Sequence, residues 1–209
     1  MQAFGKIPID VNTLNIDLLT LSAHKLYGSK RVGGLFIRND VKISSFVHGG
    51  GHEKGIRSST ENIPGIVGFG KACELCKKRM QKDNVHLKKL QDMLIKNVSL
   101  IEESFLNGHP EKRLSNNTHF RFNAVEGESL LLSLDAEGIA ASTGSACSST
   151  KLKASHVLLA IGLDEVQAHG SLRLSLGRNN TEDEIQYVLE RIPGIVNRLR
   201  KMSPLWKKK

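Results

Sequence analysis

Hydrophobic and polar positions divide the first part of the chain into short elements. Two apolar runs rich in β-prone residues, 16–21 and 33–38, are typical of short strands, and 25–31 is then the loop between them. Residues 47–60 follow, rich in glycine and polar groups and poor in apolar ones. A structureless loop of this length is uncommon in a compact domain unless it has a function, so we expect one here.

A long helical pattern comes next. Asn62 and Pro64 are typical of a helix start, and apolar residues then recur at helical spacing over 66–100. The pattern fits one long helix or two in series, and either would connect two lobes. Cys73 and Cys76 lie inside it without a second ligand pair, so we interpret them as packing or partly exposed thiols rather than metal ligands.

The rest of the chain alternates between strand-like and helix-like patterns. Strands are predicted over 118–122, 139–143 and 171–176, and helices over 126–134, 155–161 and from a capping box at 181–184 towards residue 199. The pattern therefore fits an α/β fold in which the long helix connects two lobes.

Composition and charge narrow the class of protein. The chain has 209 residues, 39% hydrophobic and 24% charged, as expected of a globular protein. Its net charge of +9 would suit an acidic partner, but no basic stretch is interleaved with aromatics, so we expect no nucleic-acid partner. No apolar run approaches the roughly 18 residues that span a bilayer, and we see no signal peptide. We therefore predict no membrane contact. Three cysteines do not form a disulfide framework, which together with the lack of a signal peptide predicts a cytoplasmic location.

Lys25 is the first candidate for chemistry. A lysine held between the end of a strand and a turn at Gly28 can lose water and act as an amine nucleophile towards a carbonyl. Ser22 and His24 could both donate to one anionic group, such as a phosphate. The alternative is a solvated loop lysine.

Three further stretches add to this site. Cys147 lies in the small, flexible stretch 144–149, which would leave a thiol accessible, although a half-buried cysteine is the alternative. Arg173 lies in mid-strand, where its planar fork suits a carboxylate, although a solvent-facing arginine would show the same alternation. Arg57, Ser58 and Thr60 in the glycine-rich loop could bind an anion, although a surface loop without a ligand is the alternative. Together these features describe a pyridoxal-phosphate site that removes sulfur from an amino acid.

Five motifs, in order, resemble the signatures of the cysteine desulfurases, the NifS/IscS-like members of the class V aminotransferases. They are Ser22-Ala23-His24-Lys25-Leu26-Tyr27-Gly28, His48-Gly49-Gly50-Gly51-His52-Glu53, Arg57-Ser58-Ser59-Thr60-Glu61-Asn62, Ser142-Thr143-Gly144-Ser145-Ala146-Cys147 and Ser171-Leu172-Arg173-Leu174-Ser175-Leu176-Gly177. The resemblance implies the C-terminal part of a PLP-dependent transferase of fold type I. Residues 1–80 would then be the remainder of the large PLP-binding domain, and residues 81–209 the linking helix and small domain.

The resemblance also implies a role for each residue around the cofactor. Lys25 would bind pyridoxal 5'-phosphate covalently, Ser22 and His24 would hold its phosphate, and Gln2 would contact its hydroxyl. Thr60 would reach the phosphate of the other subunit's cofactor, since the family works as a homodimer.

The implied reaction converts L-cysteine to L-alanine. Arg173 would bind the α-carboxylate, and Cys147 would carry the sulfur as a persulfide to an iron–sulfur scaffold protein. In the family the segment at the start of this chain lies near the middle of the protein, so the pyridine-binding aspartate and the ring-stacking histidine would precede it. Ser59 stands where the family usually has glycine, and Ser115 where it usually has proline. Two alternatives stay open: an incomplete fragment that keeps dimer or scaffold-binding surfaces, and a related selenocysteine or cystine lyase.

Overall fold

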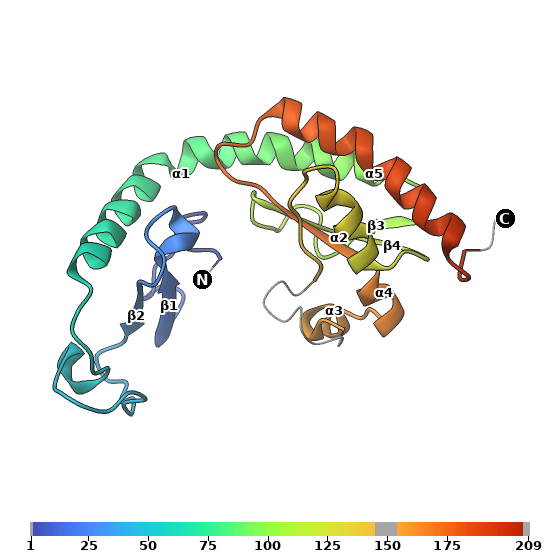
Figure 1. The fold of residues 1–209 in the computed structure, drawn as a ribbon. Helices are drawn as coiled ribbons and strands as arrows, with labels where there is room; N and C mark the ends of the chain where they lie inside the picture. The colour runs from blue at the N-terminus through green and yellow to red at the C-terminus, as the bar shows by residue number, and fades with distance from the viewer. Residues whose placement is uncertain (1, 145–153, 207–209) are drawn as a thin grey trace. The chain divides into compact units, whose positions relative to one another are not determined.

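The computed structural model describes residues 2–144 and 154–206, and the chain divides into two compact units. Unit 1 is Met1–Lys82 and unit 2 is Asp83–Lys209. Helix α1, Ile63–Val98, contributes its first part to unit 1 and its last part to unit 2 (Figure 1). The pattern left one or two helices open, and the structure has one.

Unit 1 is built on a strand pair. Strand β1 (Leu18–Ser22) pairs antiparallel with β2 (Gly33–Ile37), as the two apolar runs predicted. The short helix η1 (Ala23–Leu26) follows β1 directly. The buried core of this unit is small: Leu26, Ala72 and Cys76, with Phe4, Phe69 and Cys73 packed against them.

The glycine-rich loop of unit 1 is more ordered than we expected. It contains the short helix η2 (Glu53–Gly55) and an isolated bridge between Val47 and Arg57. The Ser58 hydroxyl is buried and donates to the Gly50 carbonyl at 2.6 Å. The segment has no regular strand or long helix, as predicted, but side-chain and backbone hydrogen bonds within it give it local order.

Unit 2 is an α/β unit around a three-stranded antiparallel sheet in the order β3-β4-β5. Its elements are β3 (Ser104–Leu106), β4 (Asn117–Phe122), α2 (Gly127–Asp135), α3 (His156–Ala160), α4 (Glu165–His169), β5 (Ser171–Ser175) and α5 (Glu182–Met202). Figure 1 shows α5 in red alongside the green second part of α1. His86 on α1 lies 2.9 Å from the Asn180 carbonyl, and Lys89 forms an ion pair with Glu182.

One face of this sheet carries the main core. Alternate residues of β4 and β5, including Phe120, Phe122 and Leu172, are fully buried. The last part of α1, together with α2 and α5, supplies the other side of the same cluster. The residues between them on the strands, such as His119 and Arg173, therefore occupy the opposite face of the sheet.

Local sequence signals explain where the helices of unit 2 begin. The Thr181 hydroxyl accepts the Glu184 backbone N–H at 3.2 Å, and the Glu184 carboxylate accepts the Thr181 N–H at 3.1 Å, which confirms the predicted capping box. At α2 the carboxylate of Glu126 accepts two backbone N–H groups, so Glu126 is the cap rather than a first-turn residue. Gly127 is required there, since a Cβ would lie 2.5 Å from the His169 carbonyl.

Three expectations for unit 2 need correction. The strand predicted over 139–143 forms only a single bridge, between Ser142 and Arg173. Strand β3 and helix α4 were missed because three and five residues are too short to show a period. Helix α3 begins after Ser155 as expected, but no N–H in the described residues donates to that hydroxyl.

Among the described helices, none combines the length and the apolar character needed to cross a membrane.

Candidate functional site

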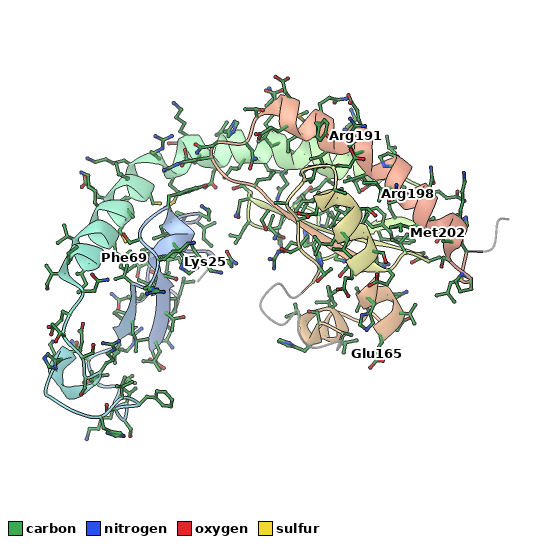
Figure 2. The ribbon with its side chains drawn as sticks, in the orientation of Figure 1. Lys25, Phe69, Glu165, Arg191, Arg198 and Met202 are labelled. Carbon is green, nitrogen blue, oxygen red and sulfur yellow. The ribbon has the colours of Figure 1, made fainter. Side chains whose placement is uncertain are left out.

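Lys25 lies where β1 ends, as its position in the sequence predicted. It belongs to η1 and is half-buried, whereas His24 beside it is exposed. Figure 2 labels Lys25 on η1 and Phe69 on the facing helix α1, both within unit 1. Helix η1 ends at Tyr27, which has a positive φ of 62°. The turn is closed by the Gly28 N–H, which donates to the Ala23 carbonyl at 2.9 Å.

Ser22 and His24 come together beside this lysine. The Ser22 Oγ lies 2.9 Å from the Nδ1 of His24, within hydrogen-bond distance. A hydroxyl and an imidazole next to a lysine amine form a donor set that suits a ligand carrying both a carbonyl and a phosphate. The residues of unit 1 therefore fit pyridoxal 5'-phosphate chemically.

Gln2 and Thr60 lie on other segments of unit 1. Both are exposed, and within the described residues neither side chain forms a hydrogen bond or ion pair with Ser22, His24 or Lys25. Their roles stay predictions.

Arg173 is the candidate residue in unit 2. It lies on β5 opposite His119 of β4, and on its other side it exchanges backbone hydrogen bonds with Ser142, at 2.6 and 3.2 Å. Its neighbours Leu172 and Leu174 are buried in the core, so the arginine side chain belongs to the opposite face. Its Nε is nevertheless buried and has no hydrogen-bond partner among residues 2–144 and 154–206.

His119, Arg113 and Arg121 form a polar cluster with Arg173 that our sequence reasoning missed. Burial, together with the charges of Arg173 and Arg113, lowers the pKa of His119 to about 4. In the part of the chain that the structure describes, the Nε2 of His119 and the Nε of Arg121 are also buried without hydrogen-bond partners. Each such atom costs about 1–3 kcal/mol of stability, a cost that a bound ligand could offset.

The alternation in 118–122 was the signal that could have revealed part of this cluster. It already placed His119 and Arg121 on one face of a strand, alternating with residues that are buried: Thr118, Phe120 and Phe122. It did not reveal which strand lies next to them, because that pairing joins segments more than fifty positions apart.

Of the three cysteines, the structure describes the two on α1, Cys73 and Cys76. Cys147 and its stretch from residue 145 onwards lie outside the described residues. Cys76 is buried, and its Sγ lies 3.6 Å from the Leu26 carbonyl, so it packs as expected. Burial, with a contribution from Cys76, raises the pKa of Cys73. No cluster of three His, Cys, Asp or Glu side chains in the described residues could hold a metal ion.

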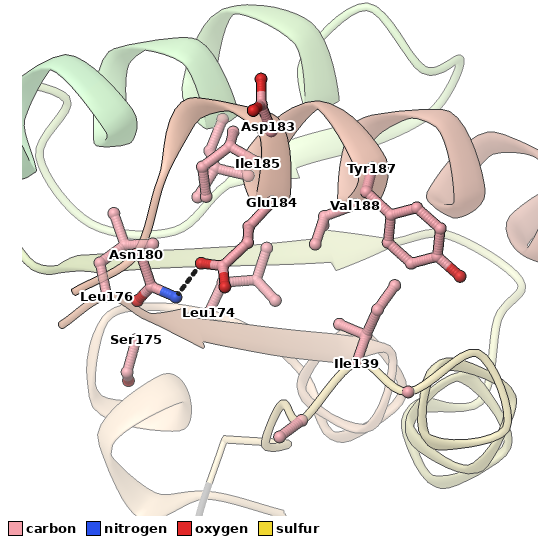
Figure 3. Close-up of a pocket in the computed structure, with 13 residues that line it drawn as sticks. Ile139, Leu174, Ser175, Leu176, Asn180, Asp183, Glu184, Ile185, Tyr187 and Val188 are labelled. Atoms are coloured by element: carbon pink, nitrogen blue, oxygen red, sulfur yellow. Dashed lines mark hydrogen bonds between the residues drawn. The ribbon is translucent and has the colours of Figure 1, made fainter.

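A cavity of about 540 Å³ lies elsewhere in unit 2, between the start of α5 and the end of β5 (Figure 3). Its walls are mostly apolar, with Leu174, Leu176 and Val188 among them. The Asn180 amide donates to the Glu184 carboxylate at 2.9 Å at its rim. Of the predicted site residues that the structure describes, none lines this cavity.

Comparison with known proteins links these features to one family. The family described as Aminotransferase class-V matches residues 1–188. Cysteine desulfurase IscS 1 of Archaeoglobus fulgidus is 52% identical over 206 residues, covering 99% of this chain and 54% of that protein. Cysteine desulfurase IscS of Clostridium botulinum is 55% identical over 209 residues, covering 99% of this chain and 53% of that protein.

Solved structures agree with the sequence comparison. A NifS-like protein from Rickettsia africae superimposes with a TM-score of 0.86 at 31% identity, over 94% of this chain and 52% of that one. Another NifS-like protein gives a TM-score of 0.84 at 36% identity, over 94% and 51%. The chain thus spans about half the length of the relatives it matches, and the α/β fold predicted as part of fold type I is confirmed. On this evidence the chain belongs to the class-V aminotransferase family.

Proposed function

We propose that this chain carries the C-terminal part of a PLP-dependent cysteine desulfurase. One observation supports this proposal most strongly. Over nearly its whole length the chain is more than 50% identical in sequence to two proteins named cysteine desulfurase, one archaeal and one bacterial. The residues at the end of β1 and on the polar face of the unit 2 sheet support it chemically.

The unit 1 residues would bind the cofactor. Lys25 would use its amine to hold the cofactor covalently, while Ser22 and His24 would donate to its phosphate. Gln2 would contact its hydroxyl, and Thr60 would reach across a homodimer to the cofactor of the second subunit. When bound, PLP supplies the electron sink that the reaction needs, and the protein supplies orientation.

The overall reaction takes L-cysteine and the Cys147 thiol to L-alanine and a Cys147 persulfide, so that one sulfur atom moves and no external oxidant is needed. Arg173 would bind the α-carboxylate of the substrate with its guanidinium fork. The persulfide sulfur would then pass to an iron–sulfur scaffold protein or another acceptor. We place this chemistry in the cytoplasm, where thiols stay reduced.

Borohydride trapping tests the proposal most directly. The purified chain is mixed with PLP, its visible absorption is recorded, and the labelled lysine is mapped after reduction. We expect a visible band and a label on Lys25, and loss of both in Lys25→Ala. Lys30→Ala is a matched control, because Lys30 is an exposed lysine of the same β1–β2 connection. A label scattered over surface lysines would contradict the assignment of Lys25.

A further inference from the structure

A row of polar side chains crosses the sheet of unit 2 through Arg173. Ser142 lies opposite Arg173 on one side, and His119 lies opposite it on the other. Asn107 follows β3 and lies opposite His119, since its backbone N–H donates to the His119 carbonyl at 2.7 Å. Directly opposite residues of antiparallel strands share a face. The four side chains therefore lie side by side on the face away from the core.

The cations of this face carry no compensating anion within the described residues. Arg121 donates to the Asn107 side-chain carbonyl at 3.0 Å, and Arg113 donates to the Asn107 backbone carbonyl at 2.8 Å. Both acceptors are uncharged. In the described ranges none of Arg113, Arg121 and Arg173 forms an ion pair. The positive charges of this face could therefore pair with an anion. The Nε of Arg173 has no hydrogen-bond acceptor among the described residues.

His119 is the neighbour that borders Arg173 across the strand pair. Its imidazole is neutral at neutral pH, because burial and the charges of Arg173 and Arg113 disfavour protonation. A carboxylate at this position would pair with Arg173 and cancel its charge. A neutral ring carries no charge that could pair with Arg173, so the positive charge of the guanidinium stays available.

We propose that His119 is a positioning residue for Arg173: it holds the guanidinium in place as a neutral neighbour, so that the charge is free to bind the α-carboxylate of the substrate. The inference deepens the proposed function and rests on it only for the identity of the carboxylate. Asn107, on the far side of His119, completes the row: its backbone N–H donates to the His119 carbonyl, and its side-chain carbonyl accepts from Arg121.

Chemical modification of arginine tests this without cofactor or turnover. The chain is treated with phenylglyoxal, which reacts with free guanidinium groups, and the rate at Arg173 is followed by peptide mass spectrometry. We expect L-alanine to slow the modification of Arg173, while L-alaninamide, which lacks the carboxylate, has no effect. Arg191, on α5, reports any general effect of the ligands (Figure 2).

Substitutions at His119 separate positioning from simple packing. His119→Glu should pair with Arg173 and slow its modification roughly tenfold even without ligand, the effect of one charge-assisted hydrogen bond. His119→Asn should keep the protection by L-alanine, whereas His119→Ala should weaken it by about threefold or more. Asn197→Glu, on the exposed side of α5, adds the same charge elsewhere in unit 2 and should behave as the parent chain.

The proposal is wrong if L-alanine does not protect Arg173, or if His119→Glu leaves its modification rate unchanged. If His119→Glu fails to fold by circular dichroism, the comparison of His119→Asn with His119→Ala decides, and equal protection in both overturns the proposal. Failure of PLP to label Lys25 would instead contradict the proposed function. The arginine-modification experiment could still be interpreted in that case, because it uses no cofactor.

Discussion

Arg200 and His119 are polar side chains enclosed by unit 2 in two different ways. The guanidinium of Arg200 is paired: it donates to the backbone carbonyls of Asn123 and Glu103, each at 3.1 Å, and stacks 4.2 Å from the ring centroid of Trp206. The ring of His119 has a buried nitrogen, Nε2, that finds no hydrogen-bond partner within the described residues. The first side chain should stabilise the fold, and the second should make it sensitive to acid.

Arg200→Ala should lower the free energy of unfolding by about 2–4 kcal/mol, because it leaves two carbonyls unpaired and removes packing from a side chain that is only 2% exposed. Arg198→Ala, an exposed arginine of the same helix labelled in Figure 2, is the control and should change stability by less than about 0.5 kcal/mol. Urea unfolding measures both, and an equal loss in the two variants would contradict the role of Arg200.

The lowered pKa of His119 predicts a loss of stability in acid. The unfolded chain protonates this ring near its ordinary pKa of 6.5, but the folded chain does so only near 4. The contribution of His119 to the free energy of unfolding is therefore fully present above about pH 6.5. Roughly 2–3 kcal/mol of that free energy is lost as the pH falls towards 4.

His119→Gln should flatten this dependence, since glutamine does not titrate. The measurement is urea unfolding at pH 7 and at pH 4.5 for both proteins, with His48→Gln, an exposed histidine of unit 1, as the control. An unchanged difference between the two pH values in His119→Gln would show that His119 titrates normally.

Among the elements, α5 illustrates how a short local signal sets a boundary. Its first turn is closed by the reciprocal bonds of Thr181 and Glu184, and three acidic residues lie where the helix dipole favours them. Hydrogen bonds from Asn180 and the Thr181 backbone lower the pKa of Glu184. The helix then buries Ile185, Ile192 and Val196 in the main core.

Thr181→Ala should cost about 1 kcal/mol of stability by removing the cap, whereas Thr181→Ser should keep most of it. The midpoint of thermal unfolding is the measurement. Equal loss in the two variants would mean that the methyl group of Thr181, rather than its hydroxyl, supports the start of α5.

For the molecule as a whole, the two units differ in how much they bury. The main cluster of unit 2 contains seventeen buried hydrophobic residues, whereas that of unit 1 contains three. Regions with few buried apolar contacts open at lower free energy. Unit 1 should therefore be the less stable unit of the chain.

Hydrogen exchange followed by mass spectrometry measures this difference. Backbone amides of the β1–β2 pair should exchange faster than those of the β4–β5 pair, although both are antiparallel ladders of five residue pairs. Adding PLP should slow exchange around η1 if Lys25 and its neighbours bind it. Equal protection in the two ladders would contradict the difference in core size.

Much of the fold and part of the site followed from the sequence alone, because those features depend on neighbours within a few positions. The runs that became β1 and β2, the capping box at Thr181 and the position of Lys25 at the end of a strand are all of this kind. Only the tertiary structure decided that His119 lies opposite Arg173 and that Ser142 forms a single bridge rather than a strand. Strand pairing joins residues far apart in the chain, and the burial that makes His119 neutral exists only once those strands have come together.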